Sequence, residues 1–384
     1  MNEKQLLPPE KSGETEKQSL LRPVRGLLTK KAVAGMVILA VIGALLLVPQ
    51  IPQAFASQAQ GFLAGQSTPA TQAPTDSLPG SLPTDSQKSQ APTTQGTLAI
   101  QARPATNRSY YMTSGSTDKA NHLGCAQGRA DKADHELSHV ILDFGAQASN
   151  GSGTFFPGTN PGIFISNRQI EKVVEAFAQG YSSCVGRTSR VTLGLDIGTN
   201  NSGRGVSFAN GKIWARLVLA VRSFNAAHHL SAHVVTFGAN DIESWGSASA
   251  AIQWAKGYHS GGAGNYVNFG SLDGCPPVGG CNGGWTYFDY WSVSNTSVAW
   301  VVPEIYNQAG TQATQWELLD LYSVQHHHSP LFFLGPLDQH DILPGCCRGT
   351  NNTAQAAWNQ LWRALHSHRS TAQNLLFSME IRWE

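Results

Sequence analysis

The sequence predicts an α/β protein whose folded part is a (β/α)8 (TIM-like) barrel, complete or with an incomplete or irregular sheet. Two observations support this. From about residue 106, short apolar runs typical of buried parallel strands alternate with longer stretches typical of helices. Seven or eight such units fit into residues 106–384, and a barrel of this kind takes about 250 residues. An open doubly wound sheet is the alternative, although no glycine-rich phosphate loop follows the first predicted strand.

Each predicted strand is a short apolar run, and each predicted helix is a longer stretch with apolar residues three or four positions apart. The strands are expected at 139–145, 191–198, 232–240, 266–270, 298–306, 331–337 and 375–383. The helices are expected between them, at 168–184, 211–229, 247–259, 285–293, 314–325 and 356–368. Strand and helix alternate throughout, which is the order that a parallel sheet requires.

A membrane-insertion signal precedes the predicted barrel. The run 32–48 holds 17 residues without a charge, and four basic residues stand shortly before it: Arg22, Arg25, Lys30 and Lys31. A span needs about 17 to 25 apolar residues, and the basic flank stays cytoplasmic. We expect a basic cytoplasmic tail over 1–31 and a transmembrane signal anchor over 32–49. A signal peptide cleaved after Ala56 is the alternative, since residues 54–56 fit the small-x-small pattern of signal peptidase.

Residues 57–105 are rich in Ser, Thr, Pro, Gln and Gly and poor in large apolar side chains. Such a stretch cannot bury enough apolar surface to offset the entropy of ordering it. We expect a disordered linker that holds the barrel domain, residues 106–384, away from the bilayer. The expected location is the cell membrane, single-pass with an extracytoplasmic C-terminal domain, or the exterior if the signal peptide is removed.

All six cysteines lie beyond this linker, which is typical of an oxidising compartment. They are disulfide candidates: Cys125, Cys184, Cys275, Cys281, Cys346 and Cys347. The short stretch from Cys275 to Cys281 could close locally, and Cys125 with Cys184 would tie the start of the domain to its first predicted helix. The connectivity stays open, above all for adjacent Cys346 and Cys347. Zinc is less favoured, because no Cys-x-x-Cys pair occurs.

The charge balance excludes one class of partner. A net charge of +1 with 13% charged residues lacks the basic surface that binds phosphates, so we expect no nucleic acid partner. We also expect no cofactor and no metal. The consecutive side chains of His326, His327 and His328 do not converge as tetrahedral ligands do, and His135 and His139 lack a third ligand. A monomer is expected.

Acidic residues stand at or near the ends of four predicted strands, and these are the catalytic candidates: Asp143, Asp196, Asp241, Glu243 and Glu304. In a barrel the carboxyl ends of the strands converge on one face, where enzymes of this fold place their active sites. A carboxylate inside an apolar run is costly to desolvate without a partner or a task. Lys and Arg are nearly absent from the same runs, so ion pairing explains the set poorly. For Asp196 taken alone, a cap or an ion pair is an equal alternative.

Paired acids suit glycoside hydrolysis, in which one carboxyl group donates a proton while the other stays ionised. Asp241 and Glu243 are alternate residues, so both face one side of an extended strand, and their repulsion raises one pKa. At these residues the sequence resembles glycoside-hydrolase-like barrels of exported bacterial proteins, particularly lysozyme-type and chitinase-type families with Asp-x-Glu at a strand end. The resemblance implies Glu243 as proton donor and Asp241 as its electrostatic partner or the group that orients an N-acetyl substituent. The further aspartates of the chitinase pattern are missing from 237–240.

All ten tryptophans lie in the barrel domain, and flat amphipathic rings make platforms for sugars. The candidate substrate-binding residues are Trp245, Asn240, Tyr306, Trp285 and Trp383. The sequence therefore predicts a cell-surface or secreted glycoside-hydrolase-like domain that acts on a polysaccharide or a cell-wall glycan, with the membrane reached through the N-terminal segment. The alternative is a non-catalytic barrel that serves as a carbohydrate-binding or cell-envelope architecture module.

Overall fold

The computed structural model describes residues 101–134, 137–159, 162–186, 189–339 and 350–384, all within one compact unit. The predicted membrane segment 32–49 and the two cysteines Cys346 and Cys347 lie outside these ranges. Within the described ranges, no helix has the length and apolar character that crossing a membrane requires.

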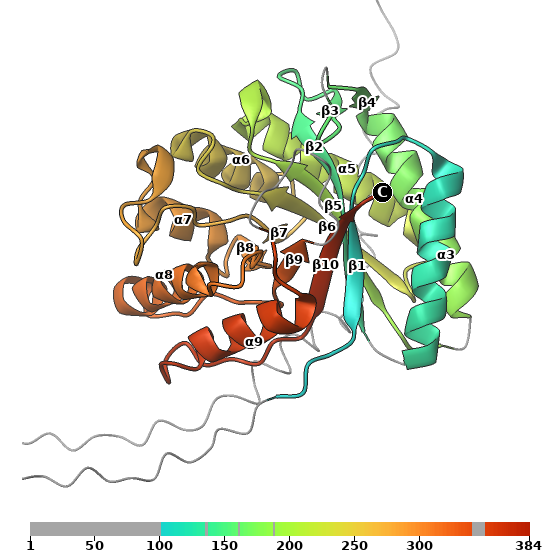
Figure 1. The fold of residues 1–384 in the computed structure, drawn as a ribbon. Helices are drawn as coiled ribbons and strands as arrows, with labels where there is room; N and C mark the ends of the chain where they lie inside the picture. The colour runs from blue at the N-terminus through green and yellow to red at the C-terminus, as the bar shows by residue number, and fades with distance from the viewer. Residues whose placement is uncertain (1–100, 135–136, 160–161, 187–188, 340–349) are drawn as a thin grey trace, which may run out of the picture. The chain divides into compact units, whose positions relative to one another are not determined.

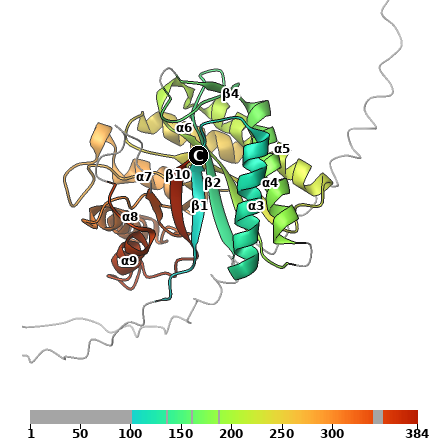
Figure 2. The same cartoon turned by 45° about the vertical axis from the view of Figure 1, so that its right-hand side comes forward.

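Eight parallel strands form the sheet, in the order β8-β7-β6-β5-β2-β1-β10-β9. They are β1 (Thr106–Tyr111), β2 (Ser138–Gln147), β5 (Leu193–Asn200), β6 (Val234–Asp241), β7 (Tyr266–Asn268), β8 (Ala299–Val301), β9 (Leu337–Gln339) and β10 (Ser378–Trp383). Figure 2 shows β1 between β2 and β10, so the first and last strands are neighbours. Two isolated parallel bridges, Val301 to Phe333 and Glu304 to Leu337, link the two ends of this order. The sheet is thus a curled, irregular TIM-like barrel.

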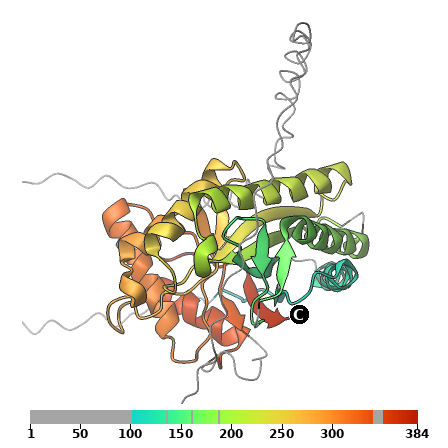
Figure 3. The same ribbon diagram turned by 90° about the horizontal axis from the view of Figure 1, so that it is seen from above.

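Seven helices connect successive strands and lie on the outside of the sheet (Figure 1). They are α3 (Thr117–Asp134), α4 (Asn167–Val185), α5 (Phe208–Ala227), α6 (Ala248–Ser260), α7 (Tyr287–Ser294), α8 (Thr311–His327) and α9 (Ala354–Leu365). Seen from above, the helices surround the strands (Figure 3). A small antiparallel pair, β3 (Gly153–Phe155) and β4 (Phe164–Ser166), extends the end of β2. Two short 3-10 turns, Gly203–Gly205 and Asn282–Gly284, complete the elements.

Hydroxyl side chains fix where most of these helices begin. The side chain of the residue before the helix accepts a hydrogen bond from a backbone N–H in the first turn, which satisfies a donor that the helix itself leaves unpaired. This occurs at Ser166, Ser207, Ser247 and Thr353. At Thr286 the reciprocal bond from Asp289 completes a capping box.

The core has two parts because strand side chains alternate between faces. One face packs against the helices, where Trp214, Trp254, Trp316 and Trp358 are all at most 1% exposed. Large apolar side chains contribute about 1.5–3 kcal/mol each when fully buried. The other face lies inside the barrel and includes buried Ile141, Phe237 and Ile381, among others.

Helices α3 and α4 approach unusually closely, because glycines stand at the contact. A Cβ atom on Gly124 would lie 2.1 Å from the carbonyl oxygen of Phe177, and one on Gly180 would lie 2.0 Å from that of Asn121. The Cys125–Cys184 disulfide joins the same two helices, and Cys275–Cys281 closes a short loop after β7. Both pairings considered from the sequence are therefore present.

The parallel strand β1, the helix α3 and the small antiparallel pair of β3 and β4 escaped the sequence-based prediction. The run 139–145 belongs to the second strand, because β1 and α3 precede it. The β1 segment, TNRSYY, does not form an apolar run, yet two of its polar side chains are buried. Asn107 Oδ1 and Ser109 Oγ accept hydrogen bonds from the backbone N–H groups of His139 and Ile141, at 3.0 and 2.9 Å. These side chains replace part of the backbone ladder between β1 and β2.

Candidate functional site

Three carboxyl groups converge at the carboxyl end of the sheet. Asp241 ends β6, Glu243 follows two residues later, and Glu304 follows β8 and bridges to Leu337. One carboxyl oxygen from each of the three lies within 4.8 Å of the others. The structure thus brings together three of the five acids selected from the sequence, and we call them the acid cluster.

Two members of the acid cluster accept hydrogen bonds from neighbouring side chains. The Tyr306 hydroxyl donates to Glu304 Oε1 at 2.8 Å, and the hydroxyl groups of Tyr306 and Tyr111 are 3.1 Å apart. The Ser271 hydroxyl donates to Glu243 Oε1 at 2.8 Å, and the indole N–H of Trp245 donates to Glu243 Oε2. Glu304 and Glu243 are therefore each held by hydrogen bonds from different neighbouring side chains.

Asp241 differs from its two partners. Its Oδ1 atom is enclosed by protein and has no hydrogen-bond donor. The backbone around Glu243 is fixed by Asn201, whose Oδ1 accepts from Glu243 N at 3.1 Å and whose Nδ2 donates to Glu243 O at 2.6 Å. The loop after β6 is thus held by two hydrogen bonds, while one oxygen of Asp241 has no hydrogen-bond donor among the described residues.

Burial and mutual repulsion favour the protonated forms of the acid cluster. The pKa values of Asp241 and Glu304 are raised well above their usual range, first by burial and then by the carboxyl group of Glu243. The pKa of Glu243 is raised by burial, against the opposing effect of the hydrogen bonds from Ser271 and Trp245. Because the three groups are coupled, the cluster as a whole retains protons to higher pH than separate carboxyl groups would.

Asp143 lies close to the cluster without bonding to it. Its side chain is 1% exposed, and its Oδ1 accepts a hydrogen bond from Gly145 N at 3.1 Å. Burial raises the pKa of Asp143 to about 7. Its charge in turn raises the pKa values of Asp241 and Glu304. Asp143 is therefore an electrostatic neighbour of the site.

Asp196 lies apart from the cluster. It is fully buried in β5, and its Oδ2 is 2.7 Å from Nε2 of His139 on β2. In the strand register Asp196 stands opposite Ile141, two residues before the level of Asp143. The structure places it in a buried pair inside the barrel, which is the ion-pair alternative raised for this residue from the sequence.

The five candidate substrate-binding residues divide into two groups. Trp245 is 75% exposed beside Glu243, Tyr306 contacts Glu304, and the Trp383 ring lies 4.8 Å from that of Tyr111. Asn240 is fully buried, and strand alternation turns it to the face opposite Asp241. Trp285 is 3% exposed, packs on Tyr290 and donates to Gly246 O, so it belongs to the core.

Several residues at the site were not selected from the sequence: Tyr111, Asn201, Ser271 and Asp273. Tyr111 ends the strand that the apolar pattern missed. Ser271 and Asp273 follow the predicted strand 266–270 directly, so a search for polar residues after each strand would have found them. Asp273 adds a further negative charge, which raises the pKa values of Asp241, Glu243 and Glu304.

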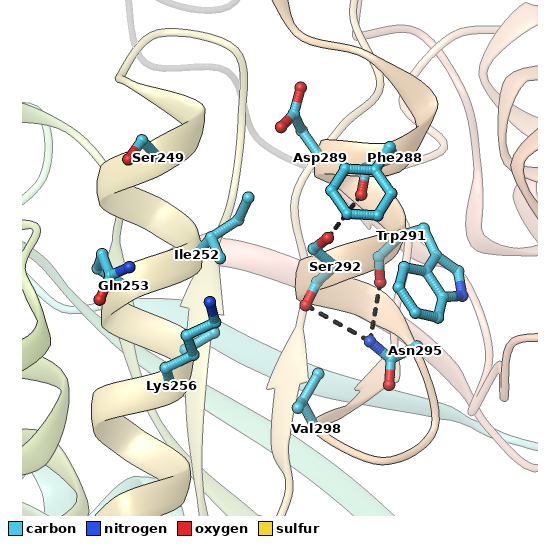
Figure 4. A pocket seen from close by; sticks show the side chains of 11 residues that line it. Ser249, Ile252, Gln253, Lys256, Phe288, Asp289, Trp291, Ser292, Asn295 and Val298 are labelled. Carbon is cyan, nitrogen blue, oxygen red and sulfur yellow. Dashed lines mark hydrogen bonds between the residues drawn. The ribbon is translucent and has the colours of Figure 1, made fainter.

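A separate cavity of about 540 Å³ lies on the outside of the barrel, between α6 and α7. Figure 4 shows Ile252 and Lys256 of α6 facing Phe288 and Ser292 of α7 across it. None of the residues that line it belongs to the acid cluster. Its size therefore says nothing about the chemistry at the carboxyl end of the strands.

The described residues that could hold a metal ion are the three acids of the cluster, whose oxygen atoms suit a hard cation such as Mg²⁺ or Ca²⁺. The histidines at the end of α8 do not converge. His327 stacks on Trp291 with ring centroids 3.4 Å apart, while His326 lies 4.4 Å from the Tyr322 ring.

Comparisons with known proteins add little to this geometry. No protein-family model matches the chain, and no curated protein matches it. Among solved structures, the chain is similar to a sugar phosphate isomerase/epimerase from Parabacteroides distasonis, with 9% sequence identity and a TM-score of 0.36. That match covers 75% of this chain and 90% of the other. A TM-score so low carries no argument, and the barrel architecture is established by the strand order and register alone.

Proposed function

We propose that this chain is an exported carbohydrate-active barrel protein that hydrolyses glycosidic bonds of a polysaccharide or a cell-wall glycan. The convergence of Asp241, Glu243 and Glu304 within 4.8 Å at the carboxyl end of the strands supports the proposal. Glycoside hydrolysis needs one protonated and one ionised carboxyl group on either side of the bond to be cut. Burial and mutual repulsion prevent acids of this kind from all being ionised at the same time. A protonated and an ionised carboxyl group are therefore present together.

The surroundings of each acid suggest its role. Glu243 stands beside the exposed Trp245, so a sugar stacked on that ring would bring its glycosidic oxygen toward Glu243. Glu243 then donates its proton to the leaving oxygen as the bond from the anomeric carbon breaks. Because burial and Glu243 raise the pKa of Glu304, this carboxyl group must lose its proton as the substrate binds. Oriented by Tyr306, it then forms an ester with that carbon as a carboxylate, and water activated by Glu243 hydrolyses the ester. Asp241 orients the substrate or stabilises the developing positive charge.

The short separation favours retention of configuration at the anomeric carbon. Inverting glycosidases keep their carboxyl groups about 6.5–9.5 Å apart to admit a water, whereas retaining ones keep them about 5–5.5 Å apart. One oxygen atom from each acid lies within 4.8 Å of the others, which is nearer to the retaining than to the inverting spacing. The stereochemistry of the first product, followed by NMR, tests this point.

Glu243→Gln tests the proposal directly. The change keeps the size and hydrogen bonding of the side chain but removes its ionisable proton, so it separates acid catalysis from packing. We expect glycan hydrolysis to fall by about 10²- to 10⁴-fold with glycan binding largely intact. Release of reducing ends from peptidoglycan, chitin-like and glucan substrates measures it.

Asp241→Asn is the companion variant and should cost less, because Asp241 does not transfer the proton. Activity of Glu243→Gln equal to that of the wild type would exclude Glu243 as the acid. A wild-type protein that cleaves none of these substrates would exclude the hydrolase function.

A non-catalytic carbohydrate-binding or cell-envelope module is the second candidate. One observation favours it: Tyr306, Ser271 and Trp245 already satisfy oxygen atoms of Glu304 and Glu243, as in a site built for stability. A wild type that binds one of these glycans and cleaves none would support this candidate. Trp245→Ala should then abolish the binding, with Phe288→Ala, an exposed aromatic on α7, as the matched control.

We also propose that the domain lies outside the cytoplasm, tethered by segment 32–49 or released after Ala56, and acts as a monomer. The two disulfides support an oxidising environment. Fractionation should find the protein in the membrane or the medium, with the domain accessible to added protease in intact cells. Recovery in the cytosol would contradict this location.

A further inference from the structure

The charge around the acid cluster has one sign. Asp143 and Asp273 lie close enough to raise the pKa values of Asp241 and Glu304, which brings the number of carboxyl groups at the site to five. The charged groups with the largest effects on the pKa values of these two acids are all acidic. Buried charges in proteins ordinarily have partners of opposite sign or are neutralised by protonation. A positively charged ligand would therefore stabilise the ionised forms of these acids.

A donor is also missing. The Oδ1 atom of Asp241 is enclosed and receives no hydrogen bond, although an unsatisfied buried acceptor is unfavourable. Glu304 and Glu243 by contrast accept from Tyr306, Ser271 and Trp245. The unfilled acceptor thus lies on the one acid of the cluster that neighbouring side chains leave unsupported. A ligand with several N–H donors on one atom would fill it.

An aromatic ring borders the same position. Trp245 is 75% exposed, and its indole N–H bonds to Glu243, so the ring stands at the edge of the cluster with a face open to solvent. Such a ring stacks on the apolar face of a sugar and attracts a positive charge held near it. An exposed aromatic ring beside a cluster of acids therefore suits a sugar that carries a cation.

We propose that the site selects a sugar with a free amino group, such as a glucosamine unit, over its N-acetylated and its acidic counterparts. An ammonium group offers three N–H donors and one positive charge, and it reaches both Asp241 and the neighbouring carboxylates. An acetamide offers one donor and no charge. A uronic acid or a phosphorylated sugar would bring a further negative charge to these five acids. The inference rests on the proposed carbohydrate function and names its substrate class.

Three probes of equal length test the selectivity with the full-length wild-type chain: a glucosamine hexamer, an N-acetylglucosamine hexamer and an oligogalacturonate hexamer. Calorimetry at about pH 6 should give a Kd for the glucosamine hexamer about tenfold or more below that for the acetylated one, with the galacturonate weakest. The advantage of the amino sugar should shrink as salt is raised, since ions screen the partly exposed charges. Equal or tighter binding of the acetylated or acidic probe would overturn the proposal, and so would a failure to bind any of the three.

Two isosteric variants distinguish the effect of a charge at the acid cluster from the effect of the net charge of the protein. Asp241→Asn should reduce the preference for the amino sugar to about twofold or less, because it weakens binding of the amino sugar more than binding of the acetylated probe. Asp134→Asn makes the same change on the exposed last turn of α3 and should leave the preference unaltered. A preference that survives Asp241→Asn, or that falls equally in both variants, would exclude Asp241 as the ammonium ligand.

Product analysis of the same mixtures keeps this result distinct from the proposed hydrolysis. Selective binding without cleavage of any probe would leave the amino-sugar site standing and remove the hydrolase. Cleavage of the acetylated probe with no preference for the amino sugar would support the hydrolase and exclude the amino-sugar site.

Discussion

Asp196 and Glu304 are both buried carboxyl groups of the sheet, yet their surroundings differ. Asp196 is fully buried and has a neighbour of potentially opposite charge, His139, at 2.7 Å. Glu304 is 5% exposed and is surrounded by further acids and by the Tyr306 hydroxyl. The first arrangement pairs one carboxyl oxygen with an imidazole nitrogen, whereas the second places a carboxyl group among other acids and one hydroxyl group. Burial of an acid alone therefore does not mark a functional site; the identity of its neighbours does.

Removal of His139 should have the largest effect on stability. The His139→Ala change leaves Asp196 buried without its partner, and loss of one partner of a buried pair typically costs about 3–5 kcal/mol. Denaturant unfolding measures the change. His122→Ala, on the exposed side of α3, is the matched control and should be near neutral. A loss below about 1 kcal/mol for His139→Ala would mean that the pair contributes no more than a surface contact.

The buried acids whose pKa values are raised should make the free energy of unfolding fall as pH rises. Burial raises the pKa of Asp143 from 3.8 to about 7, so the folded state binds a proton that the unfolded state has released. Stability attributable to Asp143 is thus greatest below about pH 4, declines up to about pH 7, and has then lost about 4 kcal/mol. Asp241 and Glu304 act in the same direction.

Unfolding at pH 5 and at pH 8 measures this decline, and Asp143→Asn should flatten it. The same decline in the variant and in the wild type would show that Asp143 is ionised at no cost in the folded state.

Tyr306→Phe should have the smallest effect on stability and a specific effect on titration. It removes the hydrogen bond to Glu304, which costs about 1 kcal/mol, and the loss of this donor should raise the pKa of Glu304 further. NMR titration of the glutamate carboxyl carbons measures the second effect. Tyr322→Phe, which removes a half-exposed hydroxyl on α8, should leave that titration unchanged. Identical Glu304 titrations in both variants would exclude Tyr306 as its donor.

The fold was predictable where burial required apolar side chains. β6 reads VVTFGAND, an apolar run with acids after it, and both the strand and its role in the site follow from that pattern. β1 and α3 were not predictable in this way, because Asn107 and Ser109 are buried for their hydrogen bonds and α3 packs through glycines. The spacing of apolar residues reveals neither buried polar side chains that form hydrogen bonds nor glycines at a helix contact.

The site was predictable only in part, for a related reason. The Asp-x-Glu spacing at Asp241 and Glu243 fixes their side of the strand, and the position of Glu304 after another strand suggests convergence. The pairing of Asp196 with His139 depends on the register between β2 and β5, which no local pattern specifies. Asn240 and Trp285 were selected for their chemistry, but alternation and packing turn both away from the acids.

The contact between the first and the last strand has a consequence for how this protein comes into being. Thr106 pairs with Ser378, so the barrel cannot form its β1–β10 contact until nearly the whole chain has been synthesised. Until then, the strands that have already formed have unpaired edges. The Cys125–Cys184 bond spans only 59 residues and can form much earlier, while later segments are still emerging. In a chain-entropy model, this bond stabilises the folded state by about 4 kcal/mol, because it lowers the conformational entropy of the unfolded chain. It would also hold α3 and α4 together until β10 has been synthesised.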